Sequence, residues 1–141
     1  MTQTSKTIVK STAPLLKKKG EEITKTMYPI LFSKYPEVEV LFKDAEPNQH
    51  KKLASAVYAY ASNIDRLEQL SAGIAVMVKA HIKTNVQPEH YPMVGDALLT
   101  AIKEVLGEDV ATPEVIDAWA EAYQFLADIL IAEEAKEYAK K

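Results

Sequence analysis

The chain has 141 residues, of which 48% are hydrophobic and 26% are charged, and its formal net charge is −3. This length and composition suit a single globular domain over residues 1–141, and the small negative charge gives no basic excess that would favour nucleic acid or an anionic membrane as a partner. Because the sequence has no cysteine, no apolar run long enough to span a bilayer and no apolar signal segment at residues 1–10, we expect a cytoplasmic domain without disulfides that binds neither nucleic acid nor membrane.

Apolar residues recur along the chain at steps of three and four positions, and strict apolar–polar alternation is almost absent. This is the period of a helix, so the fold is predicted to be all-α. The predicted helices cover residues 5–19, 21–33, 47–63, 68–84, 89–106 and 113–138, with a short turn at 36–41. A four-helix bundle would leave two of these helices unplaced, whereas helices packed in crossed pairs use all of them.

Specific residues mark several of the predicted helix ends. Thr112, Pro113 and Glu114 are typical of a helix start, because the threonine can cap the helix, the proline fits its first turn and the acid lies near its positive end. Gly107 is suited to end the preceding helix. Residues 44–48 interrupt the apolar pattern and are predicted to form a loop.

One of the three histidines, His81, falls in the apolar stripe of a predicted helix. Leu70, Ile74 and either Met77 or Val78 precede it at helical spacing, so its imidazole is expected to face the interior. A buried imidazole either has a polar partner in the protein or binds a ligand, and the periodicity leaves both alternatives open. Because the chain has no cysteine, His81 is the first candidate ligand for a metal or haem.

Six segments together resemble a known family. They are MYPILF at 27–32, YPEV at 35–38, LF at 41–42, AYASNI at 59–64, KAHIKTNVQPEHYPMVG at 79–95, and DAW with AY at 117–119 and 122–123. Their order and spacing resemble the bacterial single-domain haemoglobins, including the thermoglobins, and the globin domain of flavohaemoglobins. The resemblance implies a single globin domain, with helices packed three over three around haem b.

On one face of the haem, the resemblance implies that His81 binds the iron through a ring nitrogen. Tyr91 and Glu134 would lie behind His81, where a carboxylate that accepts the other imidazole hydrogen makes the histidine a stronger electron donor. In the sequence by itself, Glu134 resembles a solvent-exposed helix acid next to Glu133.

On the opposite face, the resemblance implies that Tyr28 donates a hydrogen bond to the bound gas and that Gln49 is a second donor. His50 follows Gln49 directly and is also in phase with Leu53 and Val57. It is therefore an alternative pocket-facing residue, and if its imidazole turned inward the iron could become six-coordinate.

Four further residues are assigned to haem contacts by the resemblance: Phe42, Leu53, Val57 and Val94. Phe42 would pack against the haem plane, Leu53 and Val57 would wall the pocket, and Val94 would lie below the ring. In the sequence by itself, Phe42, Leu53 and Val94 are ordinary core residues, and this holds even if haem is present.

The function implied by the resemblance is reversible dioxygen binding together with dioxygenation of nitric oxide to nitrate. Its ligands would be dioxygen, nitric oxide and similar diatomic molecules. The reaction consumes an electron and the sequence has no Gly-rich phosphate loop, so a nitric oxide dioxygenase of this kind would need a separate reductase. The expected oligomeric state is a monomer or a homodimer.

Two alternatives stay open at this point, one within haem proteins and one of a different class. One is a globin for oxygen storage, transport or sensing, which binds gas without sustained catalysis. The other is a helical interaction domain without any cofactor, in which His81 contributes only to stability.

Overall fold

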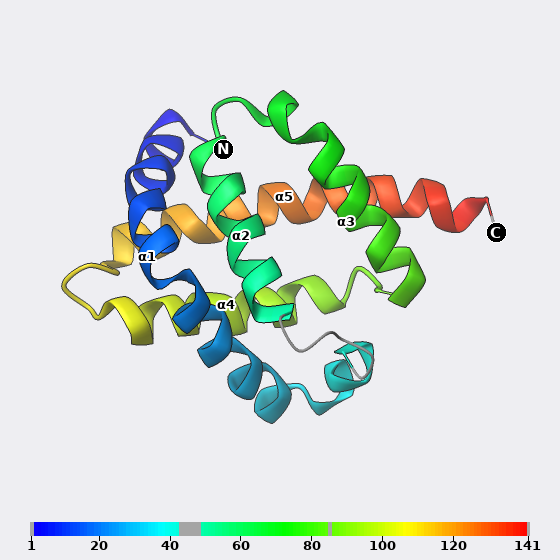
Figure 1. The fold of residues 1–141 in the computed structure, drawn as a ribbon, viewed down its shortest axis with the longest axis horizontal. Helices are drawn as coiled ribbons and strands as arrows, with labels where there is room; N and C mark the ends of the chain where they lie inside the picture. The colour runs from blue at the N-terminus through cyan, green and yellow to red at the C-terminus, as the bar shows by residue number, and fades with distance from the viewer. Residues whose placement is uncertain (1, 43–48, 85, 141) are drawn as a thin grey trace.

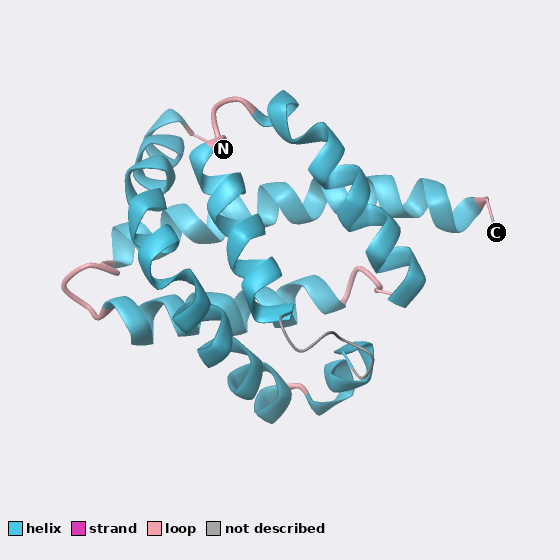
Figure 2. Ribbon diagram, viewed as in Figure 1, coloured by secondary structure: helices cyan, strands magenta, loops and turns pink. Residues whose placement is uncertain are grey.

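The computed structural model describes residues 2–42, 49–84 and 86–140, and for Gln49 the backbone only. All the elements in these ranges are helices (Figures 1 and 2), and none of the helices is long and apolar enough to cross a membrane. They are α1 (Gln3–Lys34), η1 (Pro36–Phe42), α2 (Gln49–Ser62), η2 (Leu67–Leu70), α3 (Ser71–Thr84), α4 (His90–Leu106) and α5 (Pro113–Ala139). The all-α prediction is therefore confirmed, and the predicted loop at 44–48 lies outside the described residues.

The prediction of two N-terminal helices, at 5–19 and 21–33, is wrong, because α1 is continuous from Gln3 to Lys34. Gly20 lies inside this helix and is buried, and a Cβ atom placed on it would come within 3.2 Å of the Ala54 Cβ on α2. The glycine thus allows α1 and α2 to approach closely instead of ending a helix.

The helix-end signals near the C-terminus are confirmed. The Thr112 hydroxyl accepts a hydrogen bond from the Val115 amide at 3.3 Å, and the proline at the start of α5 follows it. Gly107 ends α4 with a φ of 80°, a conformation that glycine adopts at little cost. Local sequence is sufficient to set these two boundaries.

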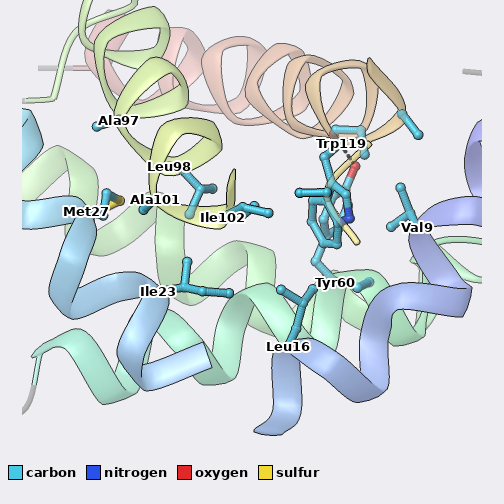
Figure 3. Packing of buried hydrophobic residues seen from close by; sticks show 14 of the residues in the cluster. Val9, Leu16, Ile23, Met27, Tyr60, Ala97, Leu98, Ala101, Ile102 and Trp119 are labelled. Atoms are coloured by element: carbon cyan, nitrogen blue, oxygen red, sulfur yellow. Dashed lines mark hydrogen bonds between the residues drawn. The ribbon is translucent and has the colours of Figure 1, made fainter. Parts of the chain in front are cut away.

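The main hydrophobic cluster lies among α1, α2, α4 and α5. Figure 3 shows its large side chains, including Ile23 and Met27 from α1, Ile102 from α4 and Trp119 from α5. The Trp119 indole donates a hydrogen bond to the Thr12 hydroxyl at 2.9 Å, which satisfies a polar group inside the cluster. This hydrogen bond connects α1 to α5, which are far apart in the sequence.

A second, smaller cluster lies among α3, α4 and α5. Its buried members are Val78, Tyr91, Ala127 and Leu130. Helix α2 packs mainly against α1, whereas α3 packs mainly against α5, which it crosses in Figure 1. Helix α3, which carries His81, is thus held by few elements of the structure.

We predict that Gly20→Val lowers the free energy of unfolding by about 1–3 kcal/mol, because the new side chain would be forced against Ala54 where α1 and α2 cross. The matched control is Gly73→Ala on α3, where nothing lies within 4 Å of the added methyl group. Since alanine is the better helix former, the control should gain about 0.5–1 kcal/mol. Urea unfolding of the parent and both variants measures their free energies of unfolding. If Gly20→Val were as stable as Gly73→Ala, the close approach of α1 and α2 at Gly20 would be contradicted.

Candidate functional site

Three helices bring together the side chains of His81, Tyr91 and Glu134. The Nδ1 atom of His81 lies 2.7 Å from Oε2 of Glu134 and 3.0 Å from the Tyr91 hydroxyl. The Tyr91 hydroxyl donates to the two carboxylate oxygens of Glu134, at 2.7 and 2.9 Å. The residues come from α3, α4 and α5, so the group exists only when all three helices are in place.

Hydrogen-bond chemistry indicates where the proton of His81 resides. An ionised carboxylate only accepts hydrogen bonds, so Nδ1, at 2.7 Å from Glu134, carries the hydrogen. In a neutral imidazole the other nitrogen, Nε2, then keeps a free lone pair. No hydrogen bond within the described residues involves Nε2, and the side chain of His81 is 30% exposed. In its neutral form, His81 would therefore present an unprotonated Nε2 on a side chain that is partly exposed.

Glu134 is buried, with 3% of its surface exposed, although its neighbour Glu133 is exposed. A buried carboxylate is costly unless it is paired and hydrogen-bonded, and His81 and Tyr91 supply this pairing. Burial, followed by the hydrogen bond to Glu134, raises the pKa of Tyr91 well above its usual range. The phenol thus stays protonated and remains a donor.

Tyr91 is itself held in place by Tyr123 of α5. The Tyr123 hydroxyl donates to the Tyr91 carbonyl at 2.7 Å. Its ring lies against Gly95, where an added Cβ atom would come within 2.7 Å of Cε2 of Tyr123. The glycine makes room for the ring one turn beyond Tyr91.

On α1, Tyr28 forms an aromatic cluster with Phe32 and Phe42. The ring centroids of Tyr28 and Phe42 are 5.4 Å apart, with an edge-to-face angle of 75°. The Tyr28 hydroxyl is buried and has no hydrogen-bond partner among the described residues. Burial raises its pKa to about 12, so the hydroxyl keeps its hydrogen. A buried donor without a partner is costly, so this position would favour a group that accepts a hydrogen bond.

The first turn of α2 is attached to α1 one turn before Tyr28. The Thr24 hydroxyl donates to the His50 carbonyl at 2.8 Å. The Nε2 atom of His50 is buried and also lacks a partner among the described residues. Gln49 begins α2, but its side chain lies outside the described residues, so its predicted role stays a prediction.

The four predicted haem-contacting residues are apolar and only partly buried. Phe42, Leu53, Val57 and Val94 all pack at the margin of the main cluster. Half-buried apolar side chains, together with a free imidazole nitrogen and an unpaired phenol, are the groups that would hold a flat, largely apolar cofactor with a metal at its centre. The donor set at His81 and Tyr28 therefore fits haem.

Two tyrosines of this region were not assigned a site role from the sequence. Tyr123 was recognised only as part of the apolar stripe and the family resemblance, and Tyr138 was not singled out. The available signals were Gly95 inside a helix, which marks a close approach, and the four-residue step from Glu134 to Tyr138 on one helix face.

Comparison with known proteins agrees with this arrangement. Residues 25–130 match the family model described as Globin. A protein of Aquifex aeolicus described as an uncharacterized globin-like protein is 52% identical over 133 residues, which cover 94% of each chain. A Pseudomonas putida flavohemoprotein is 48% identical over 137 residues; the match covers 95% of this chain but only 35% of the flavohemoprotein.

A solved structure supports the same conclusion about the fold. It is an engineered carbene transferase from Rhodothermus marinus, made from a protein described as a candidate nitric oxide dioxygenase. It has 44% sequence identity and a TM-score of 0.93, and the alignment covers 99% of this chain and 96% of that chain. The likeness confirms the predicted fold class.

We predict that Tyr28→Phe reduces the loss of stability in alkali. The pKa of Tyr28 is raised from 10.0 to about 12 in the folded protein. The contribution of the protonated Tyr28 hydroxyl to the free energy of unfolding is therefore complete below pH 10 and is lost as the pH rises through about 12. Urea unfolding at a series of pH values, with tyrosinate absorbance recorded in parallel, measures this. Parallel stability curves for the variant and the parent over that pH range would contradict the burial of this hydroxyl.

Proposed function

The chain belongs to the globin family, and we propose that it holds haem b through His81 and converts nitric oxide and dioxygen to nitrate. The observation that carries this proposal is the buried Glu134 carboxylate 2.7 Å from His81 Nδ1. The Rhodothermus marinus protein behind the similar solved structure is described as a candidate nitric oxide dioxygenase, and the matched flavohemoproteins support haem as the cofactor. Haem supplies a coordination site for diatomic gases and the electron-transfer chemistry.

His81 would be the protein ligand to the iron, through its free Nε2 atom. Glu134 accepts the Nδ1 hydrogen, and this raises the electron density on the imidazole ring. Tyr91 donates to the same carboxylate and keeps it oriented. A more strongly donating histidine favours oxidised iron, so the arrangement supports reaction in preference to simple storage.

Tyr28 would act on the opposite face as the hydrogen-bond donor to the bound gas. Its hydroxyl is buried, protonated and without a partner among the described residues, so it is free to donate. Phe42 packs edge-on against its ring and limits where the hydroxyl can lie. Gln49 is proposed as a second donor, with His50 as the alternative. Leu53, Val57 and Val94 would cover the apolar faces of the haem.

The balanced reaction is NO + O₂ + e⁻ → NO₃⁻, so each turnover requires one electron. We propose that a separate reductase supplies it. This chain matches 35% of the length of the Pseudomonas putida flavohemoprotein, so the activity of the whole flavohemoprotein is not carried over to it.

We predict that His81→Ala abolishes haem binding, because no other side chain is proposed to bind the iron on that face. Absorption spectra of the purified parent and variant, both incubated with excess haem and then freed of unbound haem, measure the intense Soret band. The variant should lose this band while its far-ultraviolet circular dichroism stays helical. If the variant keeps a normal Soret band, His81 is not the ligand; a parent that never binds haem points to the cofactor-free interaction domain.

We predict that dioxygen dissociates from haem-loaded Tyr28→Phe about tenfold to a hundredfold faster than from the parent, because a hydrogen bond to a charged acceptor is lost. Stopped-flow displacement measures this rate. Nitrate yield with a supplied reductase tests the reaction itself. Sustained nitrate production by the parent that is lower in the variant supports the proposal. If the parent consumes nitric oxide rapidly but only once per haem, even with the reductase supplied, the result points to a storage or sensing globin.

A further inference from the structure

We propose that Tyr138 is a positioning residue for His81, and that its hydroxyl holds the end of α3 in contact with Glu134. This inference rests on the proposed function, since it concerns the histidine that would bind the iron. The His81 imidazole has Tyr91 and Glu134 as its hydrogen-bond partners, so Tyr138 acts on His81 indirectly.

The connection passes through the backbone of Val86. The Tyr138 hydroxyl donates to the Val86 carbonyl at 2.7 Å. The Val86 amide in turn donates to the His81 carbonyl at 2.9 Å. One peptide segment therefore links the tyrosine on α5 to the backbone of the histidine on α3.

Tyr138 also lies one helical turn beyond Glu134, so both side chains project from the same side of α5. Burial, and then the nearby charge of Glu134, raise the pKa of Tyr138, which agrees with this proximity. Glu134 holds the side chain of His81 and Tyr138 holds its backbone through Val86. The two contacts therefore attach both the side chain and the backbone of His81 to α5.

Helix α3 depends on such polar contacts because its apolar packing is limited. Of its residues only Val78 is buried, and Val76 is 69% exposed. Its main packing partner is α5. When the hydroxyl of Tyr138 is removed, the end of α3 can move away from α5, and the contact between His81 Nδ1 and Glu134 is expected to lengthen. A longer contact makes His81 a weaker donor.

The test uses Tyr138→Phe, which removes the hydroxyl and keeps the ring, in the haem-loaded protein. Tyr60→Phe is the matched control, because the Tyr60 hydroxyl also donates to a backbone carbonyl, that of Ala122, at 2.6 Å. Glu134→Gln is the reference for a weakened acceptor. Resonance Raman spectroscopy of the ferrous protein measures the iron–histidine stretching frequency, which a purely structural role would not change.

We expect this frequency to fall in Tyr138→Phe, in the same direction as in Glu134→Gln, and to keep its parent value in Tyr60→Phe. A second measurement is hydrogen exchange at the Val86 amide, followed by NMR in the diamagnetic carbon monoxide complex. Exchange should be about fivefold faster in Tyr138→Phe, the factor that corresponds to one ordinary hydrogen bond.

An unchanged stretching frequency in Tyr138→Phe overturns the positioning role, even if exchange at Val86 becomes faster. A frequency that falls equally in Tyr60→Phe also overturns it, because the effect would then be a general loss of stability. Failure of the parent to bind haem would refute the proposed function. In that case exchange at Val86 in the same purified chain decides separately whether Tyr138 holds α3, and an unchanged rate overturns the contact itself.

Discussion

The buried carboxylate of Glu134 is the group on which the arrangement of α3, α4 and α5 depends. A carboxyl group with 3% of its surface exposed must form hydrogen bonds, or the folded state loses several kcal/mol. Its described donors are His81 and Tyr91, which come from two other helices. Folding thus requires the three helices to meet at one place, and the same requirement orients the imidazole.

This polar contact compensates for uneven packing in the molecule. The main cluster joins α1, α2, α4 and α5 through large buried side chains, whereas α3 contributes one buried residue, Val78, to a smaller cluster. A helix held in this way relies more on hydrogen bonds than on burial. The helix that carries the candidate ligand is therefore the one whose position a few polar groups can adjust.

Glycine serves the same architecture at two points. Gly20 lets α2 approach α1. Helix α2 carries His50, whose carbonyl accepts a hydrogen bond from the Thr24 hydroxyl on α1. Gly95 makes room for the Tyr123 ring, which holds the backbone of Tyr91. Both faces of the candidate site are thus positioned by close contacts between helices, at places where any larger side chain would displace a neighbour.

The sequence by itself determined the helical class and most helix boundaries, and it supplied the residues of the candidate site. Helix periodicity and caps are local properties, so Thr112 and Gly107 could be interpreted from their immediate neighbours. The family resemblance named His81, Tyr91, Glu134 and Tyr28 because their order along the chain is characteristic of bacterial haemoglobins.

Only the tertiary structure showed the contacts between residues that are distant in the sequence. The predicted division of the first helix between residues 19 and 21 is wrong because Gly20 packs against Ala54, which is distant in sequence. Glu134 resembles an exposed acid until α3, 53 residues away, brings His81 to it. The contact of Tyr138 with Val86 spans 52 residues. Such contacts depend on how helices cross, and crossing is set by the packing of the whole chain, which no single segment specifies.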